Sequence, residues 1–372
     1  MTQANNVAIE SSQINSSGVL QPAGGGTGTA SGVTDFKNRI INGAMVIDQR
    51  NNGASVTPTT SQYLVDRWFA AQTTASKFSA QQNAGAVTPP AGFTNYLGMT
   101  SLSAYSITSS DVFYVQQRIE GFNIADLAWG TANAKTVTLS FWVYSSLTGT
   151  FGGALNSGAF NYCYPFNYTI STANTWQQIS VTIAGPTSGT WYTNNSIGLG
   201  IAFSLGTGSA SSGTAGSWSS STYYSATGAT SVVGTNGATF YITGVQLEVG
   251  SSATNFAYRS YGTELALCQR YYWKQGGSAA GGPYQPAEIG YCPSTTAISL
   301  FIHYPARMRV TPSIGYGGSS PLVSSFGGII ADQLTIDQAL LSVAGTGFTA
   351  GQVFRFLGNA DTTTFISYSS EL

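Results

Sequence analysis

Lys135-Thr-Val-Thr-Leu-Ser-Phe-Trp-Val-Tyr144 alternates apolar side chains with hydroxyl and aromatic side chains at every second residue. If the segment is extended, Val137, Leu139, Phe141 and Val143 lie on one face. A period of two residues is that of a β-strand with one buried face. We therefore expect a strand whose apolar face enters a core and whose other face presents Trp142 and Tyr144.

The same alternation recurs in segments 175–183, 196–205 and 238–249. In the last of these the phase changes near Gly244, as a β-bulge would cause. The second carries mainly Gly and Ala on one face, which predicts a surface that another group can approach closely. Many short strands joined by turns rich in Gly, Ser and Asn predict an all-β fold built as an antiparallel sandwich.

The chain divides into three parts by composition. Residues 1–33 are rich in Gly, Ser and Thr and have little to bury, so they form either a disordered leader or an extended segment that attaches to a partner. Residues 34–262 hold the first sandwich, including a long surface excursion at 206–236. Residues 263–372 hold a second, smaller sandwich that begins with a short helix at 263–274. Its expected strands are 297–304, 339–343, 352–357 and 363–368.

Charged side chains are scarce, at 7% of 372 residues, whereas aromatic residues make up 13%. A surface of Ser, Thr, Asn, Gln and Tyr suits hydroxyl-rich ligands and long-lived assemblies. The net charge of -1 gives no attraction to nucleic acid or anionic membranes. No apolar run approaches the length of a membrane span, and no signal peptide is recognisable, so we expect synthesis in the cytoplasm without membrane insertion.

Catalytic chemistry is not expected from this composition. His303 is the only histidine, and no nucleophile motif accompanies it. The 14 Asp and Glu residues form no evident pair in a cleft, as a glycosidase would need. The pairs Asp66–Arg67 and Arg118–Glu120 are interpreted as structural ion pairs. The three cysteines, Cys163, Cys268 and Cys292, are predicted to be buried free thiols, with one disulfide as the alternative.

Several sequence motifs, in this order along the chain, resemble those of a module of bacteriophage tail-fibre and tail-associated proteins. Its opening is matched by Asn38-Arg-Ile-Ile-Asn-Gly-Ala-Met45, Asp48-Gln-Arg50 and Tyr63-Leu-Val-Asp-Arg-Trp-Phe69. Its close is matched by Phe240-Tyr-Ile-Thr-Gly-Val-Gln-Leu-Glu-Val-Gly250 and Phe256-Ala-Tyr-Arg259. The domain that often follows is matched by Glu264-Leu-Ala-Leu-Cys-Gln-Arg-Tyr-Tyr272, Tyr304-Pro-Ala-Arg-Met-Arg309 and the final Glu371-Leu372.

The resemblance implies a jelly-roll domain of carbohydrate-binding-module type, a second β-sandwich, and a homotrimer displayed on a virion. Residues 1–33 would then dock to a tail, baseplate or capsid protein. Related sugar-binding modules can share a structural calcium between their first and last strands, which would assign the Glu248 carboxylate and the Asn42 carbonyl to it. Gly244 stands where the family often has an acidic residue. No other cofactor or metal is expected.

Glycan binding needs aromatic faces for sugar C–H groups and amides or hydroxyls for directional hydrogen bonds. The candidate glycan-binding residues are Trp142, Tyr144, Trp191, Tyr192, Asn194, Trp218, Tyr223 and Tyr224. Each taken singly has an alternative role in packing or in trimer contacts. Loop aromatics that stay exposed would favour a binding role.

These features lead to one expected function and one alternative. The expected function is that of a trimeric tail fibre, located on the virion, that binds host surface polysaccharide for adsorption. The alternative is a purely architectural component of a capsid decoration, head fibre or baseplate that binds no glycan. It predicts that the aromatic clusters lie between subunits.

Overall fold

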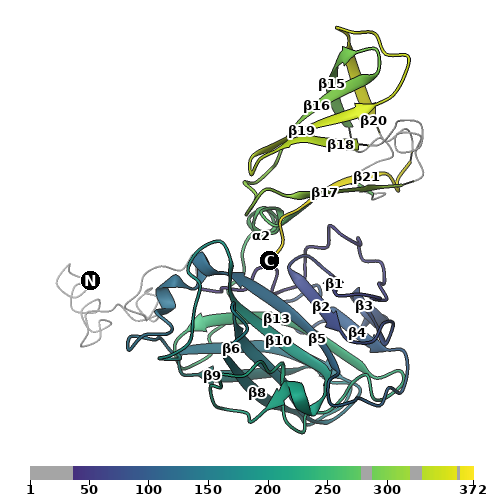
Figure 1. Cartoon of the computed structure of the whole chain (residues 1–372). Coiled ribbons are helices and arrows are strands. Elements are labelled where there is room, and N and C mark those ends of the chain that lie inside the picture. The colour runs from purple at the N-terminus through teal and green to yellow at the C-terminus, as the bar shows by residue number, and fades with distance from the viewer. Residues whose placement is uncertain (1–36, 278–286, 319–328, 358–360) are drawn as a thin grey trace, which may run out of the picture. The chain divides into compact units, whose positions relative to one another are not determined.

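The structure is a computed structural model that describes residues 37–277, 287–318, 329–357 and 361–372. It confirms the all-β fold, with two β-sandwiches in succession (Figure 1). The expected extended segment 1–33 lies outside the described residues. Residues 38–372 form one compact unit.

The first sandwich consists of two antiparallel sheets. The six-stranded sheet has the order β1 (Gln62–Tyr63), β2 (Trp68–Gln72), β5 (Val112–Glu120), β10 (Ile197–Thr207), β7 (Gly149–Ser157) and β8 (Cys163–Ile170). The five-stranded sheet has the order β3 (Phe78–Gln82), β4 (Leu97–Ser101), β13 (Thr239–Val249), β6 (Val137–Ser145) and β9 (Gln177–Ile183). The short elements between them are η2 (Ala84–Ala86), η3 (Gly121–Asn123), η4 (Ala125–Leu127) and η5 (Ser209–Ser211).

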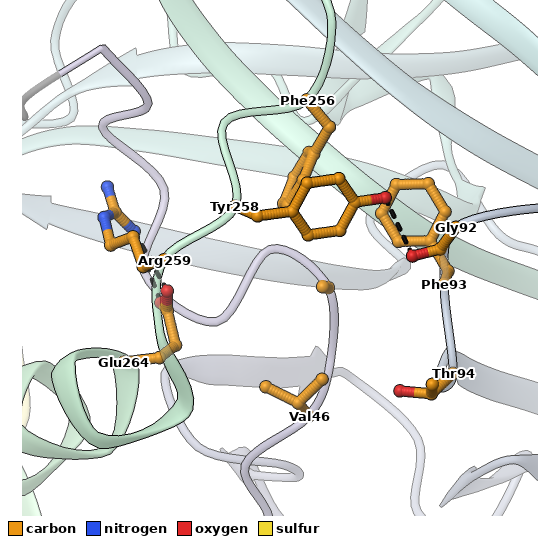
Figure 2. Close-up of a pocket in the computed structure, with 9 residues that line it drawn as sticks. Val46, Gly92, Phe93, Thr94, Phe256, Tyr258, Arg259 and Glu264 are labelled. Carbon is orange, nitrogen blue, oxygen red and sulfur yellow. Dashed lines mark hydrogen bonds and ion pairs between the residues drawn. The ribbon is translucent and has the colours of Figure 1, made fainter. Parts of the chain in front are cut away.

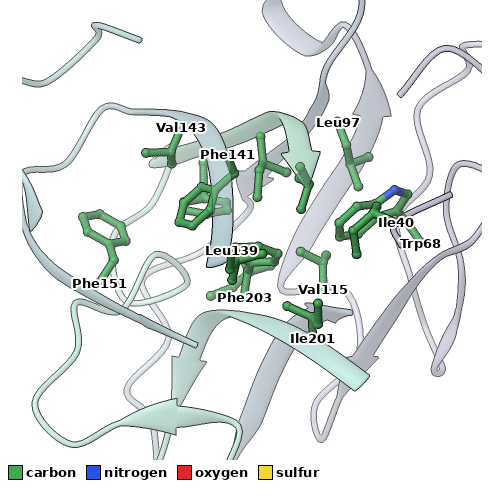
Figure 3. Packing of buried hydrophobic residues seen from close by; sticks show 14 of the residues in the cluster. Ile40, Trp68, Leu97, Val115, Leu139, Phe141, Val143, Phe151, Ile201 and Phe203 are labelled. Atoms are coloured by element: carbon green, nitrogen blue, oxygen red, sulfur yellow. The ribbon is translucent and has the colours of Figure 1, made fainter. Parts of the chain in front are cut away.

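The core lies between the inner faces of these two sheets (Figure 3). Phe141 of β6 meets Phe203 of β10 edge to face, with ring centroids 5.0 Å apart. Val143, predicted to face inward, is buried beside them. Burying one such side chain stabilises the fold by about 1.5–3 kcal/mol. The alternation in 135–144 therefore has the orientation expected from the sequence, with Trp142 and Tyr144 on the outer face of β6.

A bulge interrupts β13 where the sequence predicts one. The pairing of β13 with β6 shifts register between Thr243 and Gln246. Gly244 lies inside the shift with φ of 61°, a left-handed conformation that suits glycine. The bulge turns the following residues of β13 relative to those before it.

The second sandwich follows helix α2 (Tyr261–Gln269). Its three-stranded sheet has the order β14 (Tyr272–Gly276), β21 (Phe365–Ser369) and β17 (Ser313–Gly317). Its five-stranded sheet has the order β18 (Ile329–Leu334), β19 (Gln338–Ala344), β16 (Ala297–His303), β15 (Ala287–Ser294) and β20 (Val353–Leu357). The helix is shorter than the expected 263–274, because residues from Tyr272 onward pair with β21. Ser260 caps its N-terminus by accepting a hydrogen bond from the Thr263 amide.

Both predicted local ion pairs are wrong, because each residue pairs with a distant one. Arg67 pairs with Glu371, and its backbone has a left-handed φ of 71°. The Asp66 carboxylate instead accepts hydrogen bonds from the backbone and side chain of Gln49.

Glu120 likewise pairs with Arg270 at 2.7 Å and accepts a hydrogen bond from the Tyr271 hydroxyl. Arg118 donates to the Leu372 carbonyl. These contacts tie α2 and the last residues to the first sandwich. The three cysteines are buried free thiols, as predicted.

Candidate functional site

Aromatic side chains form a row on the outer face of the five-stranded sheet. Tyr241 of β13 stacks on Tyr144 of β6, with centroids 5.2 Å apart and planes inclined by 5°. Tyr96 stacks on the other side of Tyr241 at 5.1 Å. Trp176 packs against both Tyr96 and Tyr144 at 5.5 Å. Tyr96 and Tyr241 are buried, whereas Tyr144 and Trp176 stay half-exposed.

Trp142 continues this row towards the bulge. It shares the outer face of β6 with Tyr144, two residues further along the strand. A Cβ added to Gly244 would lie 3.0 Å from the Trp142 ring and 2.6 Å from the Phe93 ring. Both rings therefore rest on this glycine, which makes Trp142 and Phe93 neighbours. The bulge glycine brings two aromatic rings together that come from distant parts of the chain.

A cavity of about 230 Å³ opens beside Phe93 (Figure 2). Phe93, Phe256 and Tyr258 form one wall, with each pair of ring centroids between 4.8 and 5.6 Å apart. The Tyr258 hydroxyl donates to the Gly92 carbonyl at 2.8 Å, which fixes the ring. Tyr258 is nevertheless 59% exposed. An exposed ring that is held in this way would lose little conformational freedom on binding.

An ion pair forms the polar side of this cavity. Arg259 donates to both carboxylate oxygens of Glu264, at 3.2 and 3.3 Å. It also donates to the carbonyls of Ile40 and Asn38. Ala44, Val46 and Thr94 complete the lining. The cavity is smaller than typical sites for drug-sized ligands, and its size suits one ring-sized group.

We use the name aromatic strip for the connected outer-face set of Tyr96, Trp176, Tyr241, Tyr144, Trp142, Phe93, Phe256 and Tyr258. The strip combines ring faces with amides and hydroxyls on the adjoining strand. Gln178 is exposed on β9 and is the cross-strand partner of Trp142. Aromatic platforms flanked by amides match what a sugar ring requires. Two of the sequence-predicted residues, Trp142 and Tyr144, belong to this strip.

Trp191 and Trp218 lie elsewhere, in a cluster with Trp129. The three rings meet edge to face at 4.8, 5.5 and 5.6 Å. Each indole N–H donates to a backbone carbonyl: Trp129 to Lys135, Trp191 to Ser188 and Trp218 to Ala184. Tyr162 stacks on Trp218 at 5.7 Å. These bonds use every indole donor, so the cluster joins loops to the main core.

Tyr192 and Asn194 are exposed in the same loop region, and Tyr192 is 40% exposed. The Asn194 side chain accepts a hydrogen bond from the Ser196 amide within its own turn. The structure therefore does not bring these two residues into the aromatic strip.

Tyr223 and Tyr224 belong to a segment that covers the outer face of the six-stranded sheet. Tyr224 stacks on Tyr114 of β5 at 4.4 Å, with planes inclined by 13°. The Tyr223 carbonyl accepts a hydrogen bond from Asn156 of β7, and its ring rests on Gly213. Both tyrosines are half-buried and hold the excursion in place. In that position they act as packing residues.

The two calcium candidates lie in separate hydrogen-bond networks. The Asn42 carbonyl accepts from the Trp68 indole, and its side chain binds Ile47 and Asp66. The Glu248 carboxylate accepts from Thr254 and Gln246. No group of three His, Cys, Asp or Glu side chains suited to a metal occurs in the described part of the chain. The pair does not form a shared calcium cage, and the expectation that the chain holds no cofactor stays a prediction.

Six strip residues were not predicted as binding residues from the sequence: Phe93, Tyr96, Trp176, Tyr241, Phe256 and Tyr258. Phe256 and Tyr258 fall in a phrase that carries the tail-fibre resemblance, and this was a usable signal. Phe93 lies outside every strand predicted from the sequence, whereas Trp176 falls in the predicted strand segment 175–183, in phase with the exposed Gln178. Only the fold shows that they meet Trp142 and Tyr144.

No family model matches the chain, and no curated protein matches it. Solved structures similar to it include a putative sugar binding protein from Bacteroides thetaiotaomicron, at 14% identity and a TM-score of 0.34, covering 57% of this chain and 100% of that one. The tailspike protein 4 enzymatically active domain of bacteriophage CBA120 is similar at 13% identity and a TM-score of 0.32. That match covers 57% of this chain, which spans about a fifth (21%) of the tailspike domain.

A family 11 carbohydrate-binding module from Clostridium thermocellum, in complex with a mixed-linked tetrasaccharide, is similar at 11% identity and a TM-score of 0.27. The match covers 54% of this chain and 100% of the module. Similarity this low says nothing about what the present chain binds. Among the residues that the structure describes, no helix has the length and apolar character to cross a membrane.

Proposed function

We propose that this chain is a non-catalytic glycan-binding protein of a bacteriophage particle and that its first sandwich binds surface polysaccharide through the aromatic strip. The observation that carries the proposal is the exposed Tyr258 ring, which is held by Gly92 beside the Phe93 and Phe256 rings. Exposed aromatic surface that is fixed in place favours a ligand-binding role.

The strip suits a sugar chain better than an apolar ligand. Trp142 and Tyr258 both lie close to Phe93, and Gln178 supplies an amide next to Trp142. Sugar rings present C–H groups to aromatic faces and hydroxyls to amides. An extended glycan would place one ring in the cavity and further rings along the sheet.

Binding without hydrolysis is part of the proposal. A glycosidase uses two carboxyl groups that flank the scissile bond. The described lining of the cavity supplies one carboxylate, that of Glu264, and Arg259 pairs with it. A single paired carboxylate is a poor general acid or nucleophile.

Virion location and trimer formation are the finer parts of the proposal. They rest on the sequence motifs that resemble tail-fibre proteins at both ends of the first sandwich. They also rest on exposed apolar residues of the second sandwich. Phe301 and Val353 are 61% and 73% exposed, and Tyr291 on the intervening strand is also exposed. A subunit interface would remove this patch from water. Three sites per fibre would strengthen weak binding through multivalency, and residues 1–33 would attach the fibre to the particle.

The test uses purified protein labelled on lysine, with its mass measured by light scattering. We expect a trimer that binds susceptible cells and is displaced by polysaccharide extracted from them. Tyr258→Ser should abolish cell binding, whereas Tyr192→Ser, at another exposed tyrosine, should not.

Failure of the wild-type trimer to bind cells would favour the architectural alternative. In that case the strip would lie between subunits. A monomer that binds cells would contradict trimer formation but not glycan binding. Equal loss in both tyrosine variants would contradict the assignment of the site.

A further inference from the structure

The five strands beneath the aromatic strip carry almost no charge. All residues of β3, β4, β6, β9 and β13 are described, and Glu248 is the only Asp, Glu, Lys, Arg or His among them. Its side chain is 3% exposed. The carboxylate accepts hydrogen bonds from the Thr254 amide, the Thr254 hydroxyl and Gln246. This charge is therefore satisfied within the protein and does not face a ligand.

Arg259 is the one cation that lines the described cavity, and it is already paired with Glu264. One terminal nitrogen donates to both oxygens of Glu264 and to the Ile40 carbonyl, and the other donates to the Asn38 carbonyl. Glu264 is also bound by the Asn42 amide. An incoming anion would have to compete with the Glu264 carboxylate, which is close and 8% exposed. The cavity thus has no unpaired cation to offer.

Neutral hydrogen-bonding groups are available on the same face. Gln178 and Ser180 of β9 are exposed beside Trp142 and Ser140. The described structure shows no hydrogen bond from either side chain. Amides and hydroxyls both donate and accept, which matches the hydroxyls of an uncharged sugar.

We infer that the aromatic strip binds a neutral polysaccharide and excludes chains bearing carboxylate or phosphate groups. The inference rests on the proposed glycan-binding function and names its ligand class. A carboxylate brought onto this face would lose water without gaining a cationic partner, which is costly. A neutral hexose chain carries no such cost.

The scarcity of charge on this face also predicts how the glycan affinity depends on salt. Binding between a neutral chain and an uncharged face contains no term that ions screen. We expect the affinity to change less than about twofold between 50 and 500 mM NaCl.

The experiment compares matched polymers and a printed glycan array. Polygalacturonate and its carboxyl-reduced product differ only at C6 of each residue. We expect the full chain to bind neutral glycans on the array and to prefer the reduced polymer over polygalacturonate by about tenfold or more. Preference for acidic glycans, with affinity that falls as salt rises, would overturn the inference and leave the proposed function standing. No binding to any printed glycan would overturn both.

A pair of charge variants at Gln178 locates the effect. Gln178→Lys adds a cation next to Trp142, and we expect it to strengthen binding of polygalacturonate about threefold, because an exposed charge pair contributes little. Gln178→Glu is the matched control and should weaken it. The residue is exposed, so both variants should fold. Equal and measurable binding of polygalacturonate by both variants would overturn the inference, because the polymer would then bind away from the strip.

Discussion

The two outer faces of the first sandwich differ in what lies on them. On the six-stranded sheet, β7 and β10 present small residues such as Gly152 and Ala202, and the excursion 208–230 packs onto them. Its short strands β11 (Ser212–Gly213) and β12 (Ser225–Ala226) pair with each other above this face. On the five-stranded sheet, the strip presents large rings, and Trp142, Tyr144 and Trp176 remain half-exposed.

The difference teaches how to interpret a face of small residues. The sequence predicts that another group can approach β10 closely, and in the structure Tyr224 of the excursion packs against Ala202. Gly200 and Gly198 of the same strand are approached instead by Gln116 of β5 and by Ile124.

The excursion also contacts the neighbouring strand β7. A Cβ on Gly152 would lie 2.5 Å from the Ser225 hydroxyl oxygen and 2.9 Å from the Ala226 nitrogen. The small residues on the six-stranded sheet let the backbone of the excursion pack closely against it. The face with large aromatic residues, on the five-stranded sheet, is the one that stays open to a ligand.

The largest expected effect separates two tryptophans that the sequence treats alike. Trp218→Ala should destabilise the fold by about 3 kcal/mol, because the ring packs on Trp129 and Tyr162 and its N–H is bonded. Trp142→Ala should cost less stability but weaken glycan binding about tenfold or more, as loss of a binding hot spot does. Urea denaturation and calorimetric titration measure the two quantities. If Trp218→Ala lost binding at unchanged stability, the roles assigned to the two residues would be reversed.

A smaller effect on stability is expected where the excursion packs on β7. Gly152→Ala should lower the free energy of unfolding by about 1–3 kcal/mol, since its new Cβ meets Ala226 backbone. Gly262→Ala is the matched control, because an added Cβ there meets nothing within 4 Å. We expect the control to be neutral or slightly stabilising, as Ala favours a helix over Gly. Equal stability of both variants would mean that the excursion does not rest on β7.

The pH dependence of stability should arise on the side of the six-stranded sheet. Burial raises the pKa of Asp66 to about 7, and the Arg50 charge and the Gln49 hydrogen bonds offset this only in part. Because the folded pKa exceeds the unfolded value, the protonated group favours folding at low pH. That contribution is complete below about pH 4 and is lost as the pH rises through 7.

We therefore expect the Tm of the wild type to fall between pH 5 and pH 8, and Asp66→Asn to reduce that slope. Thermal melts at four pH values measure it. A variant with an unchanged slope would remove Asp66 as the cause. Glycan affinity should stay constant over the same range, because the strip carries no exposed charge.

The smallest effect concerns calcium. Asn42 and Glu248 have their oxygens bound in separate networks. We expect EDTA to leave the Tm unchanged within about 1 °C. A fall in Tm that added calcium restores would show a metal site and revive the assignment made from the resemblance.

The strands were predictable from the sequence where one face is buried. The segments 135–144, 175–183, 196–205 and 238–249 match β6, β9, β10 and β13 within a few residues. The bulge at Gly244 was also visible, since a bulge changes the phase of alternation. In the second sandwich, the helix was predicted too long, because the tertiary pairing of Tyr272 with Ser369 overrides a local helical pattern.

The binding face was predictable only in part. Trp142 and Tyr144 follow from strand phase, which is local. Tyr258 and Phe93 reach the strip through contacts between distant segments, and no periodicity encodes such contacts. Trp191 and Trp218 appeared equally suitable because loop aromatics in a Gly/Ser-rich sequence look exposed until their partners are known. Composition thus indicates an aromatic, uncharged surface, and the fold decides which rings form it.

Hydrogen–deuterium exchange with and without a glycan selected on the array tests the central claim most directly. The account predicts new protection in β6 and β13 and in the segments 88–96 and 254–258, which carry the strip and the cavity. Segments 190–196 and 212–226 should exchange as before. Protection confined to these two segments would contradict the account and place the ligand on the loops or on the face beneath the excursion.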